Sequence, residues 1–276
     1  MLFKASGYNG AITFLDVFMT VFDAIILGIV EGITEYLPVS STAHLYLTGQ
    51  MLGLEQDAFL TAFEIIIQIA PIFSVMLIYR ERLLQSAALW IRLITAFIPT
   101  GIVGLLFHKQ IEAMFSANST VALMILTGIA FLAVEFTYRP KEHSVKDLEA
   151  VSIKQALSIG VFQVFSLVPG VSRSGMTILG GMLSGLSRDA AMGFSFLLAI
   201  PTMGAASGYM LLKEYSSLSF EHFGALAVGF IVSFIVGWIA VKTFLAVVSR
   251  YSFKPFGIYL IASGLLFGLF GIDLVH

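Results

Sequence analysis

Hydrophobic residues along the chain gather in long stretches separated by short polar segments. A membrane-spanning helix needs roughly 20 apolar residues to cross a hydrocarbon core of about 30 Å. Six stretches meet this requirement, at about 58–80, 86–107, 118–138, 189–212, 222–247 and 254–273. The pattern therefore predicts six transmembrane helices.

The remaining hydrophobic residues form two pairs of arms, each interrupted near a proline. The pairs are about 13–36 with 39–53, broken at Pro38, and about 151–168 with 171–186, broken at Pro169-Gly170. At a rise of about 1.5 Å per residue, the arm 171–186 reaches only about 24 Å. We therefore expect two re-entrant helical hairpins, each entering and leaving on one face of the membrane.

The two hairpins look like copies of one element. Residues 24–54 align without a gap on residues 156–186, with eight identities in 31 positions, which indicates an internal repeat. Each half then holds one hairpin and three spans, and an odd number of spans inverts the second half. The sequence predicts a single membrane domain, 1–276, with inverted repeats at about 12–138 and 151–273 and a polar connecting loop at about 139–150.

Composition agrees with this interpretation. The chain is 58% hydrophobic and 12% charged, with a mean hydropathy of +0.95, far more apolar than an average soluble domain. We therefore expect an all-α polytopic membrane protein. The net charge of -2 and the lack of a long basic run argue against nucleic acid as a partner. The absence of cysteine excludes disulfides and thiolate metal sites.

Lysine and arginine near the ends of spans indicate the orientation, because they favour the cytoplasmic side. The predicted topology places three basic loops on one side: Arg80, Arg82 and Arg92; Arg139, Lys141, Lys146 and Lys154; and Lys242, Arg250 and Lys254. Both termini should then lie outside. The first hairpin would enter from outside and the second from the cytoplasm, so that their tips meet near the middle of the membrane. The stretch 11–30 is expected to be part of the structure and not a signal peptide.

The first hairpin carries acidic and nucleophilic residues. Glu31 and Glu35 share one helix face, where like charges repel each other. A bound divalent cation, a shared proton or a facing arginine would relieve this repulsion, and carboxylate oxygens suit Mg²⁺ or Ca²⁺. After the break, Ser40 and His44 also share a face, and a hydroxyl beside an imidazole is the minimal activated nucleophile. Chance spacing of these two residues is the alternative.

The second hairpin has the features of an anion-binding site. A helix is expected to begin near Ser172-Arg173-Ser174, and its free N–H groups and positive dipole end suit phosphate. Arg173 adds a planar fork matched to phosphate oxygens, and Thr177 lies one turn further on. Ordinary capping is the alternative for the hydroxyls, and an ion pair with Glu31 or Glu35 is the alternative for Arg173. Glu64 and Gln68 share a face of one span and are weaker candidates for the same cavity.

Together these motifs resemble a known family. The pattern Glu31-x-x-x-Glu35, Pro38-Val-Ser-Ser-Thr-x-His44 and Pro169-Gly-x-Ser-Arg-Ser-x-x-Thr177 is similar to that of the bacterial undecaprenyl-pyrophosphate phosphatases of the bacitracin-resistance type. The likeness runs from about residue 20 to the end of the chain. One departure is Ala43, where the family usually has glycine.

The resemblance implies hydrolysis of undecaprenyl pyrophosphate to undecaprenyl phosphate and inorganic phosphate, which recycles the lipid carrier of cell-wall synthesis. It also implies a plasma-membrane enzyme whose site opens to the outer face and requires Mg²⁺ or Ca²⁺. Matched residue by residue, the metal ligands are Glu31 and Glu35, and the catalytic residues are these two with Ser40, His44 and Arg173. The implied phosphate-binding residues are Ser41, Thr42, Ser172, Arg173, Ser174 and Thr177.

A transporter is the competing class. Inverted repeats with broken helices that meet at mid-membrane are typical of secondary transporters, and an arginine between half-helices would bind a carried phosphate or lipid phosphate equally well. The Ser40 and His44 pair favours the enzyme, because a carrier needs no nucleophile. Expected partners are the polyprenyl pyrophosphate and membrane lipids, and a homodimer stays open.

Overall fold

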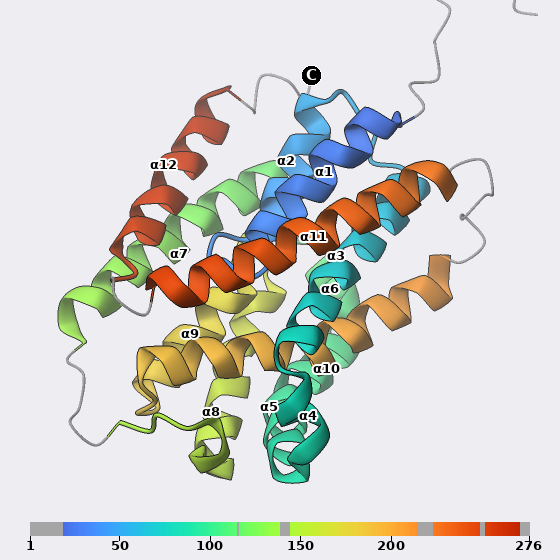
Figure 1. Cartoon of the computed structure of the whole chain (residues 1–276). Coiled ribbons are helices and arrows are strands. Elements are labelled where there is room, and N and C mark those ends of the chain that lie inside the picture. Colours follow the sequence, from blue (N-terminus) through green and yellow to red (C-terminus); the bar gives the residue numbers. More distant parts are fainter. Residues whose placement is uncertain (1–18, 115, 139–143, 215–222, 249–251, 271–276) are drawn as a thin grey trace, which may run out of the picture.

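The computed structural model describes residues 19–114, 116–138, 144–214, 223–248 and 252–270. This part of the chain is helical and contains no β-strand, so the prediction of an all-α fold is confirmed. Figure 1 shows the helices packed at varied crossing angles. The helices are α1 (Val21–Thr34), α2 (Ser41–Met51), α3 (Ala58–Ile78), α4 (Arg80–Gln85), α5 (Ala87–Leu106), α6 (His108–Glu112), α7 (Ala117–Thr137), α8 (Ile153–Val164), α9 (Arg173–Leu183), α10 (Arg188–Glu214), α11 (Phe223–Val248) and α12 (Lys254–Phe270), with short 3-10 turns at Leu148–Ala150 and Phe165–Leu167.

Five described helices are long and apolar enough to cross a membrane: Phe59–Ile78, Ala87–Leu106, Asn118–Thr137, Arg188–Tyr209 and Phe223–Ala246. They coincide with five of the six predicted spans. The sixth, predicted at 254–273, appears as the shorter apolar helix Lys254–Leu269, and residues 271–273 lie outside the described residues. The chain is therefore a multi-pass membrane protein, with at least five helices that could span.

Most helix starts are encoded by a side-chain cap. Thr20 accepts a hydrogen bond from the amide of Asp23, and Ser152 does the same for Gln155. In both cases the side chain of the third helix residue accepts a hydrogen bond from the backbone amide of the cap. Each capping box therefore satisfies two backbone amides. Asp57 and Ser86 cap α3 and α5 in the simpler way.

The two pairs of arms, which the sequence predicts to be hairpins, form the helix pairs α1 with α2 and α8 with α9, and both pairs end in the same manner. α2 and α9 each stop at a glycine with positive φ, Gly53 at 71° and Gly185 at 94°. Glycine adopts this conformation without the steric penalty of a Cβ atom. The residue after each glycine then donates back to the helix, from Leu54 N to Gly49 O and from Leu186 N to Gly181 O, both at 3.0 Å.

Glycines also bring the hairpin helices into backbone contact with membrane spans. A Cβ atom on Gly28 of α1 would lie 2.7 Å from the carbonyl oxygen of Gly229 in α11. A Cβ atom on Gly160 of α8 would lie 2.2 Å from the carbonyl oxygen of Ala96 in α5. Small residues at helix interfaces allow this approach, and they fix both hairpins against the bundle.

The order of these contacts gives the relative directions of the helices. Gly28 and Gly32 of α1 meet Gly229 and then Gly237 of α11, so α1 and α11 run parallel. Phe63 and Pro71 of α3 meet the same two glycines in the same order, so α3 is parallel to both. In the other half, α8 runs parallel to α5, because Gly160 lies against Ala96 and Leu167 lies against Gly104.

The core lies where the halves meet. α10 crosses the middle of the molecule and packs on α3, α5 and α9, and its side chains include the fully buried Phe194, Phe196 and Leu197. Tyr36, between the two hairpin helices of the first half, packs edge-on against Phe196 with ring centroids 5.0 Å apart. The turn of the first hairpin is thereby held against the central helix.

Candidate active site

The end of α1 carries both predicted carboxylates into the protein interior. Glu31, in the last turn, has no exposed surface, and Glu35, which caps the helix, is 4% exposed. Neither oxygen of Glu31 has a hydrogen-bond partner among the described residues. A buried carboxylate without partners is costly unless a proton or a cation compensates it.

Ser40 stands at the start of α2 in an unusual backbone conformation. Its φ of 68° and ψ of 83° place it in the left-handed region, the one described residue other than glycine with positive φ. A side chain in this region costs about 1–2 kcal/mol, and such strain concentrates at functional sites. The carbonyl oxygen of Ser40 accepts from the amide of His44 at 3.2 Å and contacts His44 Nδ1 at 2.8 Å.

The imidazole of His44 is held at both nitrogens. Because a carbonyl oxygen only accepts, Nδ1 must carry a proton toward Ser40. Nε2 lies 2.8 Å from the hydroxyl of Tyr259 in α12, and the two rings are nearly parallel. The ring therefore fixes the backbone of Ser40, and neither ring nitrogen forms a recorded hydrogen bond with the Ser40 hydroxyl. The role of His44 as the base for Ser40 stays a prediction.

The hydroxyls at the start of α9 form a local network. Ser172 caps the helix by accepting from the amide of Gly175 at 3.1 Å. Ser174 donates to the carbonyl oxygen of Leu37 at 2.9 Å, which joins α9 to the turn of the first hairpin. Thr177 donates back to the carbonyl oxygen of Arg173 and contacts Ser195 Oγ at 2.6 Å. Much of their hydrogen bonding therefore serves to cap α9 and to attach it to the turn of the first helix pair.

Arg173 connects the two hairpins directly. Its Nη2 lies 2.5 Å from Glu35 Oε1, across 138 residues of sequence. Nη1 donates to the carbonyl oxygen of Ser195 at 3.3 Å, and the guanidinium lies 5.6 Å from the ring centre of Tyr36. Arg173 Nε is buried and has no hydrogen-bond partner among the described residues. Of the ion pairs that the sequence left open, the structure forms the one with Glu35.

A cavity of about 150 Å³ lies at this junction. Its walls include seven residues predicted for the site: Glu35, Ser40, Ser41, Thr42, Ser172, Arg173 and Ser174. Ser41 donates to the second carboxylate oxygen of Glu35 at 2.6 Å. Glu31, His44 and Thr177 are buried and are not among its lining residues. The two polar clusters of the sequence are therefore brought together around one cavity.

Glu31 and Glu35 are the carboxylates predicted to bind a cation, and Glu64 lies near them. The charge of Glu31 lies within electrostatic range of Glu35 and Glu64. Glu64 Oε2 accepts from Gln56 at 3.2 Å, and its Oε1 is buried without a partner. The described residues contain no cluster of three or more acidic, histidine or cysteine side chains arranged around a metal. A cation here would need further ligands from substrate or water, as is usual for Mg²⁺.

Several residues of the site were not predicted from the sequence. Thr100 and Thr202 line the cavity and hydrogen-bond the amide of Gln163 at 3.0 and 3.1 Å. Gln163 occupies the position that Glu31 holds in the first repeat. Tyr259 and Ser195 support His44 and Arg173. No local signal marks these residues, since isolated hydroxyls within apolar spans are common and their partners are distant in sequence.

Comparison with known proteins shows the family of the chain. The family model of the bacitracin resistance protein BacA matches residues 24–266. The chain belongs to this family. Among curated relatives, undecaprenyl-diphosphatase of Wolinella succinogenes is 50% identical over 257 residues, covering 93% of this chain and all of the relative. The proteins of the same name from Persephonella marina and Methanococcus aeolicus are 50% and 48% identical over 252 residues, covering 91% of this chain and 99% of each relative. The BacA match spans both hairpins and the whole cavity.

Proposed function

We propose that the chain is an undecaprenyl-diphosphatase, which hydrolyses undecaprenyl pyrophosphate to undecaprenyl phosphate and inorganic phosphate. Curated relatives with this name share about half of its residues over nearly their whole length. The main structural support is the contact between Arg173 and Glu35, which come from opposite halves of the chain. They meet at a cavity lined with serine and threonine residues. This is a composite site for a phosphate group.

Arg173 is the principal phosphate ligand in this proposal. Arg173 is the one cationic residue among those that line the cavity. Ser172 and Ser174 line the same wall, beside the first amides of α9. Phosphoryl transfer depends mostly on positioning and on stabilising the charge of the phosphate oxygens. Ser41 and Thr42 would contact the phosphate from the first hairpin, and Thr177 would hold the first turn of α9 in place.

A divalent cation, Mg²⁺ or Ca²⁺, fits the acidic side of the site. The support is the pair of unpartnered oxygens on buried Glu31, next to Glu35. When bound, the cation would neutralise charge on the pyrophosphate. In the alignment of the two halves, Gln163 stands opposite Glu31. Its side chain is a neutral amide that donates hydrogen bonds to Thr100 and Thr202. The carboxylates are therefore specific to the first half.

Ser40 is the candidate nucleophile. Ser40 lines the cavity, and its side chain makes no capping hydrogen bond. Attack of Ser40 Oγ on the terminal phosphorus would break the anhydride bond, release undecaprenyl phosphate and leave a phosphoserine that water hydrolyses. Direct attack by water is the alternative route. Loss of activity in Ser40→Ala supports the covalent route, and retained activity replaces it with water.

The contacts of the hairpins support an arrangement of two inverted repeats. α1 packs on α11 and α8 packs on α5, and these are corresponding pairs when the first half is laid on the second. α1 runs parallel to α3, whereas α8 runs parallel to α5, the next span along the chain. Because consecutive spans run in opposite directions, α1 and α8 enter from opposite faces. We extend this to six spans, with α12 as the last, and two re-entrant hairpins.

The proposed location is the bacterial plasma membrane, with both termini outside. The cavity lies against Thr202 and Met203, in the second half of α10, and against Thr100, in the second half of α5. Both helices run outward under the basic-loop assignment, so the cavity would open to the outer face. A homodimer stays a prediction.

The transporter alternative is supported by the same inverted contacts, and one assay separates the two. Purified protein in detergent is given undecaprenyl pyrophosphate, and phosphate release is measured with and without a chelator. An enzyme releases phosphate with no membrane to cross and loses this activity in the chelator. Absence of phosphate release by folded protein with added Mg²⁺ or Ca²⁺ would leave a carrier as the better account.

A further inference from the structure

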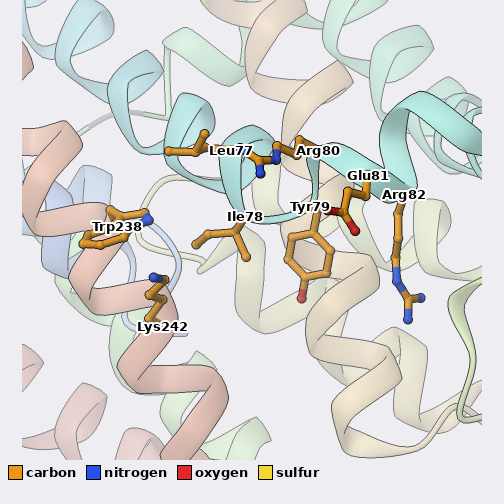
Figure 2. A pocket seen from close by; sticks show the side chains of 8 residues that line it. All are labelled: Leu77, Ile78, Tyr79, Arg80, Glu81, Arg82, Trp238 and Lys242. Atoms are coloured by element: carbon orange, nitrogen blue, oxygen red, sulfur yellow. The ribbon is translucent and has the colours of Figure 1, made fainter.

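A second and larger pocket lies away from the cavity, where α3 ends. Its volume is about 560 Å³, and it is lined by Leu77, Ile78, Tyr79, Arg80, Glu81, Arg82, Trp238 and Lys242. Figure 2 shows Trp238 and Lys242 on one helix, facing the end of α3 and the start of α4. We call it the basic pocket. None of its residues belongs to the active-site cavity.

The basic pocket and the cavity lie at different depths of the helix bundle. The cavity lies beside the second half of α5, at Thr100, whereas the basic pocket lies before the start of α5 and includes the last two residues of α3, Leu77 and Ile78. Thr100 is 13 residues beyond Ala87, which is about 20 Å along the helix axis. A ligand in the basic pocket therefore cannot touch the cavity.

The charge of the basic pocket suits an anion. Three cationic side chains and one carboxylate line it. Arg82 is partly offset by Asp147 at 3.3 Å, and both are half-exposed. Among the described residues, Arg80 and Lys242 form no ion pair. Tyr79 is neutral and does not offset the cations, whereas Asp189 lies close enough to act on Tyr79 and is a further carboxylate near the pocket.

The surroundings of the basic pocket suit a lipid. The apolar span Phe59–Ile78 stops at its edge, and Leu77 is 47% exposed. Lys242 Nζ lies 3.8 Å from the ring centre of Trp238, and tryptophan is typical of the interface between headgroups and hydrocarbon. On α11, Ile231, Ile235 and Ile239 form an exposed stripe beside it. If the headgroup of a lipid bound to the cations, its acyl or prenyl chain would lie along this apolar surface.

We infer that the basic pocket binds the anionic phosphate headgroup of a membrane lipid, on the face opposite the active-site cavity. Arg80 and Lys242 would contact the phosphate, as basic residues do at the membrane surface, and Leu77 and Trp238 would contact the first carbons of the chain. The site does not depend on the proposed phosphatase activity, because it shares no residue with it.

Native mass spectrometry of the full chain in detergent tests the inference. The probes are phosphatidylglycerol, zwitterionic phosphatidylcholine, undecaprenyl phosphate and inorganic phosphate. We expect a preference for phosphatidylglycerol over phosphatidylcholine, and a loss of about tenfold or more in that preference in Arg80→Gln/Lys242→Gln. The matched control is Lys109→Gln, an exposed lysine beyond the opposite end of α5, which should behave as the unaltered chain does.

Each outcome has a defined meaning. Equal binding of the two phospholipids, or an unchanged preference in the double variant, would overturn the inference. Competition by inorganic phosphate as strong as that by lipid would overturn the lipid assignment. Stronger binding of undecaprenyl phosphate than of phosphatidylglycerol at a site retained in Arg173→Ala would support the inference and name a polyprenyl phosphate as the ligand. The double variant should still hydrolyse the substrate, which shows that it is folded. Lys242→Arg keeps the positive charge and should retain the preference for phosphatidylglycerol.

Discussion

At the scale of single residues, Ser40 has a strained backbone conformation and is also the proposed nucleophile. Its left-handed conformation turns the chain from the end of α1 into α2 and leaves the hydroxyl on the cavity wall. Serine is an uncommon choice at such a position, where glycine fits without strain. The retention of a hydroxyl there is what we expect if the hydroxyl has a function.

Two substitutions at Ser40 separate strain from chemistry. Ser40→Gly should raise the free energy of unfolding by about 1 kcal/mol, because the left-handed strain is relieved. Ser40→Ala keeps the strain and should not stabilise the protein. Both should lose most of the phosphatase activity if the hydroxyl attacks. The measurements are thermal unfolding in detergent and phosphate release, and full activity in Ser40→Gly would remove the hydroxyl from the mechanism.

Tyr259 is expected to position His44. Tyr259→Phe removes one hydrogen bond to Nε2 and leaves that buried nitrogen unsatisfied, at a cost of about 1–3 kcal/mol. We predict a fall in kcat of roughly tenfold with KM nearly unchanged, and an altered pH profile. Ser263→Ala, one turn along α12 and bonded only within its helix, is the control. A change in KM alone would point to a role in lipid binding.

Some contacts of the candidate site could be expected from the sequence, and others could not. The facing of Arg173 and Glu35 follows from two hairpins that meet at their tips, and this pair was among the predicted alternatives. The contact of His44 with the carbonyl group of Ser40 depends on the left-handed turn, for which a serine gives no signal. Tyr259 lies 215 residues from His44, and only the packing of α12 brings it there.

At the scale of elements, each hairpin depends on a glycine that lets it touch a span. Gly160→Ala would place a methyl group 2.2 Å from the backbone of α5, where no side chain can move away. We predict a loss of about 1–3 kcal/mol of stability, typical of overpacking, with reduced activity because α8 leads into the α9 arm of the cavity.

Gly204→Ala is the matched control for this contact. A Cβ atom there would meet nothing within 4 Å, and alanine favours a helix over glycine by about 1 kcal/mol. The thermal midpoint should therefore hold or rise, while it should fall in Gly160→Ala. Equal midpoints for the two variants would contradict the packing argument.

The elements themselves were largely predictable, because membrane spans are read from hydrophobic length. The ends were less so: the expected span at 58–80 divides into α3 and the short α4 at Tyr79. The expected arm 151–168 ends in a 3-10 turn at Phe165–Leu167. Such turns arise from packing against neighbouring helices, which periodicity does not report.

At the scale of the whole molecule, the proposed orientation can be read directly because the chain contains no cysteine. Single cysteines at Glu55 and Glu149, both exposed, precede α3 and α8. A membrane-impermeant maleimide added to intact spheroplasts should label Glu55→Cys at once and Glu149→Cys only after lysis. The reverse pattern would place the active-site cavity on the cytoplasmic face.

The central claim is that the two halves form one composite site. It is tested by measuring phosphate release from undecaprenyl pyrophosphate in Arg173→Ala, in Glu35→Gln and in the double variant. The control is Arg188→Ala, which removes a similar ion pair, between Arg188 and Glu135 at 2.5 Å. Residues of one site are strongly non-additive. We predict that each single variant loses roughly 100-fold or more in kcat, that the double variant loses no more than the worse single variant, and that folded Arg188→Ala stays active. Losses that multiply in the double variant, or normal activity in Arg173→Ala, would contradict the account.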